Sequence, residues 1–93
     1  MARILIIDDE RAIRNTLREI LEYEDYQVED VDNGIDGLNL IKKMDLDLVL
    51  CDIKMSRMDG MEVLAEGLTI KPDLPFIMIS GHGTIETLSL IHI

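Results

Sequence analysis

The chain has few of the residues that would tie it to an oxidising compartment, a membrane or a polyanion. Its 93 residues include one cysteine, Cys51, which excludes an internal disulfide and a multi-cysteine metal site and suits the reducing cytoplasm. Nine Lys and Arg stand against 19 Asp and Glu, so the formal net charge of −10 opposes direct binding to nucleic acid or anionic lipid. The longest wholly apolar runs have four residues, whereas a membrane-spanning helix needs about 20. We therefore expect a cytoplasmic protein.

The apolar runs that are present are short and rich in Ile, Leu and Val. Unalternated runs of this kind are typical of strands that are buried on both faces, as in parallel sheets. The predicted strands are Arg3–Ile7, Gln27–Val31, Leu48–Cys51 and Phe76–Ile79. The second strand has only two aliphatic residues, so we expect it near the edge of the sheet.

Helical patterns lie between these strands. The apolar stripes at helical spacing are Ile13, Leu17, Ile20 and Leu21; then Leu38, Ile41 and Met44; then Met61, Leu64 and Leu68. Asp59 is the predicted N-cap of the third helix, and Gly83-Thr84 could begin a fourth. Strands that alternate with helices predict an α/β fold with a doubly wound parallel sheet.

The last six residues do not continue the pattern. Residues 88–93 contain four large aliphatic side chains and no charge, which is unlike a surface helix. We interpret residues 1–87 as one domain and residues 88–93 as an artefactual tail on a truncated reading frame. A natural C-terminus is the alternative.

Polar side chains follow three of the predicted strands. The first strand is followed by Asp8-Asp9, the third by Asp52 and the fourth by Ser80. The carboxyl ends of parallel strands form the functional edge of such a sheet, so we expect these groups to converge. Two carboxylates 4 Å apart repel by about 1 kcal/mol in water and about 4 kcal/mol at an effective dielectric of 20. A divalent cation would offset this cost, and oxygen ligands suit Mg²⁺ or Mn²⁺.

Each of these residues also has an ordinary structural interpretation. Asp9 could cap the first helix, and Ser80 could be a simple strand-end hydroxyl. On the functional interpretation, a carboxylate beside Mg²⁺ could be a nucleophile that forms an aspartyl-phosphate, with Ser80 bound to a phosphoryl oxygen.

Four segments together resemble the receiver domain of two-component response regulators. They are ILIIDDE at 4–10, LVLCDIKM at 48–55, MDGMEVL at 58–64 and IMISGHG at 77–83. The resemblance covers residues 3 to about 87. The segment SGHGT at 80–84 is most similar to receivers of the nitrogen-regulation type, which activate transcription with an alternative sigma factor.

The resemblance implies a fold and a role for each matched residue. The fold would be flavodoxin-like, with a parallel sheet in the order 2-1-3-4-5. Asp52 would accept a phosphoryl group from a sensor histidine kinase, so the domain would be a phosphoprotein and not an enzyme. Asp9 would bind Mg²⁺ directly, Asp8 would bind it through water, and the backbone carbonyl of Lys54 would be a further ligand. Ser80 would be the switch hydroxyl.

The chain also departs from the family pattern. Ser56-Arg57 stands where the family usually has a proline, and the family's lysine after the fifth strand has no counterpart. We therefore expect a receiver that lacks its fifth strand, its last helix and its output domain, and that is impaired as a switch. The edge of Phe76–Ile79 would be uncovered and could drive self-association.

Other functions remain open at this point. An aspartate-nucleophile phosphatase would need an acid two residues after Asp52, where Lys54 stands. A flavin- or nucleotide-binding module would need a Gly/Ser/Thr loop with free N–H groups after its first strand, where Asp8-Asp9-Glu10 would repel phosphate unless a metal intervened. A protein-interaction module that is never phosphorylated is the main alternative. Among the remaining residues, Cys51 is expected in the core with a raised pKa, His82 in solvent, and Met55, Met58 and Met61 mostly in the core, with a partner surface as the lesser alternative.

Overall fold

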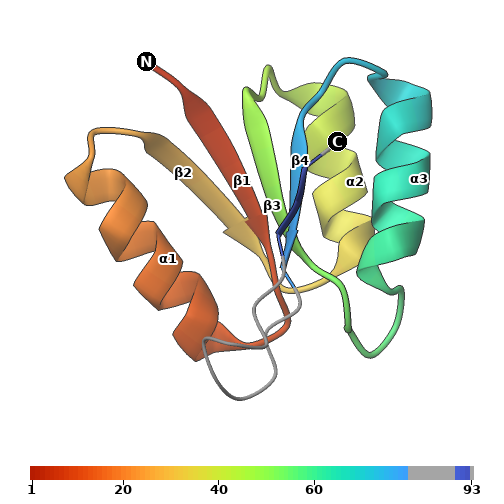
Figure 1. The fold of residues 1–93 in the computed structure, drawn as a ribbon, viewed down its shortest axis with the longest axis horizontal. Coiled ribbons are helices and arrows are strands. Elements are labelled where there is room, and N and C mark those ends of the chain that lie inside the picture. The colour runs from red at the N-terminus through yellow and green to blue at the C-terminus, as the bar shows by residue number, and fades with distance from the viewer. Residues whose placement is uncertain (80–89, 93) are drawn as a thin grey trace.

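A computed structural model describes residues 1–79 and 90–92 of the chain. Its five-stranded sheet has the order β2-β1-β3-β4-β5. The elements are β1 (Arg3–Ile7), α1 (Arg11–Tyr23), β2 (Gln27–Val31), α2 (Gly34–Lys43), β3 (Leu48–Asp52), α3 (Gly60–Ile70), β4 (Phe76–Ile79) and β5 (Leu90–His92). Helix α1 covers one face of the sheet, and α2 and α3 lie side by side on the other (Figure 1). The α/β receiver-like architecture is as predicted.

The four predicted strands are confirmed, and all four run parallel. Strand β2 lies at the edge, as its low aliphatic content predicted. Strand β3 ends at Asp52, one residue later than the apolar run, because Asp52 still pairs with Ile79 of β4.

Alternate residues of the strands enter different layers of the core. Leu5 and Ile7 face α2 and α3, whereas Ile4 and Ile6 belong to a smaller cluster with Leu17 and Leu21 of α1 packed against it. The predicted stripe of α1 is only partly buried: Ile20 remains 55% exposed, because α1 is alone on its face among the described helices. The core on the side of α2 and α3 is therefore the larger one.

Two helices begin at capping side chains. The Asp59 carboxylate accepts a hydrogen bond from the Glu62 N–H at 3.0 Å, which confirms it as the N-cap of α3. Asn33 caps α2 in the same way through the Asp36 N–H. Helix α2 ends at Lys43, so Met44 is its C-cap and not part of its stripe.

The expectation that β4 has an uncovered edge is wrong. Residues 90–92 form β5, which pairs antiparallel with β4 in the register Ile77↔His92, Met78↔Ile91 and Ile79↔Leu90. The backbone groups on the edge of β4 thus find partners within the chain. Ten residues separate Ile79 from Leu90, and parallel strands need a crossover of about a dozen or more, whereas antiparallel strands can be joined by fewer. The fifth position of the sheet is therefore filled by a reversed strand.

Three sequence predictions lie outside the described residues: the switch hydroxyl of Ser80, the solvated His82 and the helix starting at Gly83-Thr84. Within residues 1–79 and 90–92, no helix is long and apolar enough to cross a membrane.

Candidate functional site

The pairing of β1 with β3 brings the predicted acidic residues together. Ile7 of β1 is the register partner of Cys51 of β3, so the next residues along the two strands, Asp8 and Asp52, emerge side by side. Asp9 follows at the start of the loop to α1. Parallel pairing alone thus places two carboxylates at one edge of the sheet.

The side chains of Asp8, Asp9 and Asp52 form one cluster. One carboxylate oxygen from each lies within 4.8 Å of the others. Asp8 and Asp52 are 2% and 8% exposed, whereas Asp9 is open to solvent. The site is therefore an acidic pair in the sheet with a third carboxylate at its mouth.

This arrangement changes the acidity of Asp8. Burial, and less strongly the charges of Asp52, Asp9 and Glu10, raise its pKa from 3.8 to about 6, although a hydrogen bond from the Glu10 N–H to the carboxylate opposes the shift. A raised carboxyl pKa means that the site disfavours its own negative charge, so a cation that bound there would relieve this repulsion.

The donor set fits a hard divalent cation. All three side chains offer carboxylate oxygen, and oxygen ligands on opposite sides of Mg²⁺ lie about 4.2 Å apart. One oxygen from each of the three carboxylates lies within 4.8 Å of the others, which is compatible with ligation of a single ion, and the exposed side at Asp9 leaves room for water ligands. Asp8, Asp9 and Asp52 could therefore hold Mg²⁺ or Mn²⁺, as the sequence predicted.

Helix α1 does not use Asp9 as its cap. Its N-cap residue is Glu10, which makes no capping hydrogen bond through its side chain. The structural alternative for Asp9 is therefore wrong, and its carboxylate stays with the acidic cluster. Lys54 lies two residues beyond β3 with an exposed side chain, and its carbonyl as a metal ligand stays a prediction.

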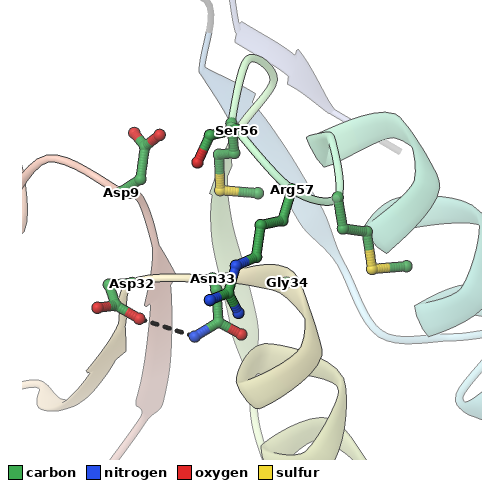
Figure 2. Close-up of a pocket in the computed structure, with 8 residues that line it drawn as sticks. Asp9, Asp32, Asn33, Gly34, Ser56 and Arg57 are labelled. Carbon is green, nitrogen blue, oxygen red and sulfur yellow. Dashed lines mark hydrogen bonds between the residues drawn. The ribbon is translucent and has the colours of Figure 1, made fainter.

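A pocket of about 240 Å³ adjoins the acidic cluster and shares Asp9 with it. Its lining residues are Asp9, Asp32, Asn33, Gly34, Met55, Ser56, Arg57 and Met58. Figure 2 shows the Arg57 side chain extending from the loop after β3 toward the start of α2. Met55 and Met58 also pack against the core, so they serve both the core and the pocket wall.

Sequence reasoning missed the part that Asp32 plays in this pocket. Asp32 directly follows β2, so the rule that drew attention to Asp8 and Asp52 applied to it as well. Its carboxylate accepts a hydrogen bond from the Asn33 amide at 2.7 Å (Figure 2). In the sequence, Arg57 stands out only as a departure from a family pattern, and no spacing rule connects it with β2.

Cys51 is a core residue, as predicted. It is fully buried, and burial together with the charges of Asp52, Asp8 and Asp59 raises the pKa of its thiol to about 12. The thiol is therefore protonated and plays no part in the chemistry of the acidic edge.

Residues 4–90 match the profile of the response regulator receiver domain. The chain is 36% identical over 84 residues to response regulator MprA of Mycobacterium sp. (strain KMS), covering 90% of this chain and 36% of MprA. It is 34% identical over 84 residues to the transcriptional regulatory protein GlrR of Escherichia coli (strain K12), covering 90% of this chain and 19% of GlrR. The chain thus spans between a fifth and about a third of the length of these curated relatives.

Two solved structures of one protein, TrrA of Thermotoga maritima, have the same fold. TrrA in complex with Mg²⁺-BeF superimposes with a TM-score of 0.85 at 36% identity, covering 89% of this chain and 72% of that one. TrrA in complex with the histidine kinase ThkA gives a TM-score of 0.83 at 35% identity, with coverages of 91% and 73%.

Proposed function

The chain belongs to the response regulator receiver domain family, and from this membership we propose that Asp52 accepts a phosphoryl group from a phosphohistidine of a sensor histidine kinase. One observation carries the proposal: Asp52 lies at the carboxyl end of the central strand β3, in one cluster with the acidic residues that follow β1. The structure of TrrA with a histidine kinase supports this class of partner.

The proposed reaction is a transfer from nitrogen to oxygen. A carboxylate oxygen of Asp52 attacks phosphorus, a new P–O bond forms, and the P–N bond to the histidine breaks. The electron pair of the broken bond stays on the imidazole nitrogen, and the product is an acyl phosphate on Asp52. No further substrate is consumed, so we propose an acceptor domain and not an enzyme that acts on other molecules.

The side chains beside Asp52 have a clear task in this proposal. Asp8 and Asp9 would hold Mg²⁺ or Mn²⁺, as the Mg²⁺-BeF complex of TrrA supports. When bound, the cation neutralises negative charge on the carboxylate and on the approaching phosphoryl oxygens. Asp8 must be ionised to contribute its full charge, and its raised pKa makes this easiest above about pH 6.

The wider role follows by analogy with the relatives. We propose that the domain acts in the cytoplasm and regulates an output domain, which in the transcriptional regulatory protein GlrR would control transcription. The SGHGT segment favours a receiver of the nitrogen-regulation type.

The test is labelling of the 93-residue protein with phosphoramidate and Mg²⁺, followed by intact mass. We expect one added phosphoryl group that is labile to hydroxylamine, as an acyl phosphate should be. Asp52→Asn should abolish the addition. Asp59→Asn is the matched control, because Asp59 caps the neighbouring helix and the amide oxygen can keep that cap.

Two outcomes would contradict the proposal. Label retained in Asp52→Asn would place the acceptor elsewhere. No label on the folded wild-type protein would favour the interaction module that is never phosphorylated.

A further inference from the structure

We propose that Arg14 is a positioning residue for the acidic site, because its guanidinium fixes the backbone of Asp8 to strand β2. This inference rests on the proposed function only in assigning Asp8 to the metal site. Arg14 lies in the first turn of α1, and its side chain is 15% exposed.

The guanidinium of Arg14 makes two hydrogen bonds that point to different elements. Its Nη1 donates to the backbone carbonyl of Asp8 at 2.9 Å, and its Nε donates to Oδ1 of Asp30 at 3.2 Å. Asp30 belongs to β2. Arg14 therefore bridges the turn that carries Asp8 to a strand on the far side of β1 from Asp52.

A second arginine, Arg18, binds the other carboxylate oxygen of Asp30. Arg18 pairs with Oδ2 of Asp30 through both Nε and Nη2, each at 2.7 Å, and with Glu22 at 2.9 Å. Both oxygens of Asp30 are thus occupied by arginines one turn apart on α1. Arg18 binds Asp30 and Glu22 but, among the described contacts, makes no hydrogen bond to Asp8, which makes it a suitable control.

The backbone of Asp8 is held by β2 on both sides. Its N–H donates to the Val31 carbonyl at 3.2 Å, while its own carbonyl accepts from Arg14, which is tied to Asp30. Its carboxylate also accepts from the Glu10 N–H at 2.8 Å. The direction in which the carboxylate points is therefore set by these three bonds, of which Arg14 supplies the only one from a side chain among the described contacts.

A positioning role and simple electrostatics predict opposite changes in Mg²⁺ affinity when Arg14 is replaced. The guanidinium is a cation beside a site for a cation, so removing its charge would by itself strengthen Mg²⁺ binding. A residue that orients a metal ligand does the reverse, because loss of such partners typically weakens metal affinity 10- to 100-fold. The sign of the change thus separates the two effects.

The experiment measures Mg²⁺ affinity of the full 93-residue protein by isothermal titration calorimetry. We expect Arg14→Met to weaken binding about tenfold or more and Arg18→Met to leave it within twofold of wild type. Arg14→Lys keeps the charge and the fold but lacks the planar fork that reaches both partners, so it should weaken binding at least threefold. Urea unfolding in EDTA establishes that each variant is folded; if Arg14→Met is not, Arg14→Lys decides.

Three results would overturn the inference. They are unchanged or tighter Mg²⁺ binding in Arg14→Met, equal weakening in Arg14→Met and Arg18→Met, and wild-type affinity in Arg14→Lys. Failure of the proposed function is distinguishable, because it shows as absence of phosphoryl label on wild type whatever the Mg²⁺ affinities are.

Discussion

Gly60 packs directly against the backbone carbonyl of Asp52. A β-carbon at Gly60 would overlap that oxygen, and the Gly60 N–H donates to the Ile53 carbonyl at 2.7 Å. The start of α3 therefore lies against the end of β3 with no room for a side chain. The closeness of this contact fixes the loop that leads away from the candidate acceptor.

Gly60→Ala should destabilise the protein by about 3 kcal/mol or more, because the obstructing atoms belong to the backbone and cannot turn aside. Gly67→Ala in the same helix is the matched control. A β-carbon there would lie 2.6 Å from Cζ of the Phe76 ring, and a ring edge can shift. Its overpacking is partly offset by the gain of about 1 kcal/mol from replacing a helical glycine. Urea unfolding compares the two, and equal losses would refute the special role of Gly60.

Much of the site could be predicted from the sequence because adjacent parallel strands run in the same direction and end at the same edge of the sheet. Once Ile4–Ile7 and Leu48–Cys51 are identified as adjacent parallel strands, Asp8 and Asp52 must emerge together. The N-cap of α3 could also be predicted, since Asp59 directly precedes an apolar stripe at helical spacing.

Other features depend on contacts that no periodicity encodes. The bridge from Arg14 to Asp30 joins residues 16 positions apart, and each has the appearance of an ordinary surface charge in the sequence. The reversed β5 was missed because the tail was interpreted as foreign to the domain, whereas an open strand edge can pair with any nearby extended segment.

Cys51 should resist alkylation in the folded protein. Its thiol is fully buried and its pKa is raised to about 12, so neither access nor thiolate is available near pH 8. We expect iodoacetamide to leave the native protein unmodified over a period in which the urea-unfolded protein reacts completely, as mass spectrometry would record. Rapid modification of the folded chain would show that β3 opens readily.

Magnesium should stabilise the folded protein through the acidic cluster. At a hundredfold excess of Mg²⁺ over its dissociation constant, the free energy of unfolding should rise by about 2.7 kcal/mol. Asp9→Ala should remove most of this gain, since Asp9 supplies the exposed ligand. Asp36→Ala, on helix α2, changes the net charge by the same amount. It is the control for the non-specific stabilisation that Mg²⁺ gives by screening the repulsion among the protein's negative charges. Equal responses of the two variants would argue against a specific site.

Asp8→Asn should make the metal-free protein more stable at neutral pH. The folded-state pKa of Asp8 is about 6 against 3.8 for the ordinary side chain, so the folded state binds the proton more tightly than the unfolded chain does. The stability associated with this proton is fully present below pH 3.8 and is lost as pH rises through 6, reaching a penalty of roughly 3 kcal/mol above pH 7.

The charges facing Asp8 are Asp52, Asp9 and Glu10 as anions and Arg14 as a cation at its carbonyl. Asparagine keeps the acceptor oxygen for the Glu10 N–H without the charge. In urea unfolding with EDTA, the advantage of Asp8→Asn over wild type should therefore be greatest at pH 7.5 and shrink to about 1 kcal/mol at pH 4.5. The other carboxylates titrate in both proteins and largely cancel in the difference. An advantage that grew as the pH fell would mean that the pKa of Asp8 is lowered by folding, and that the site already compensates its charge without a cation.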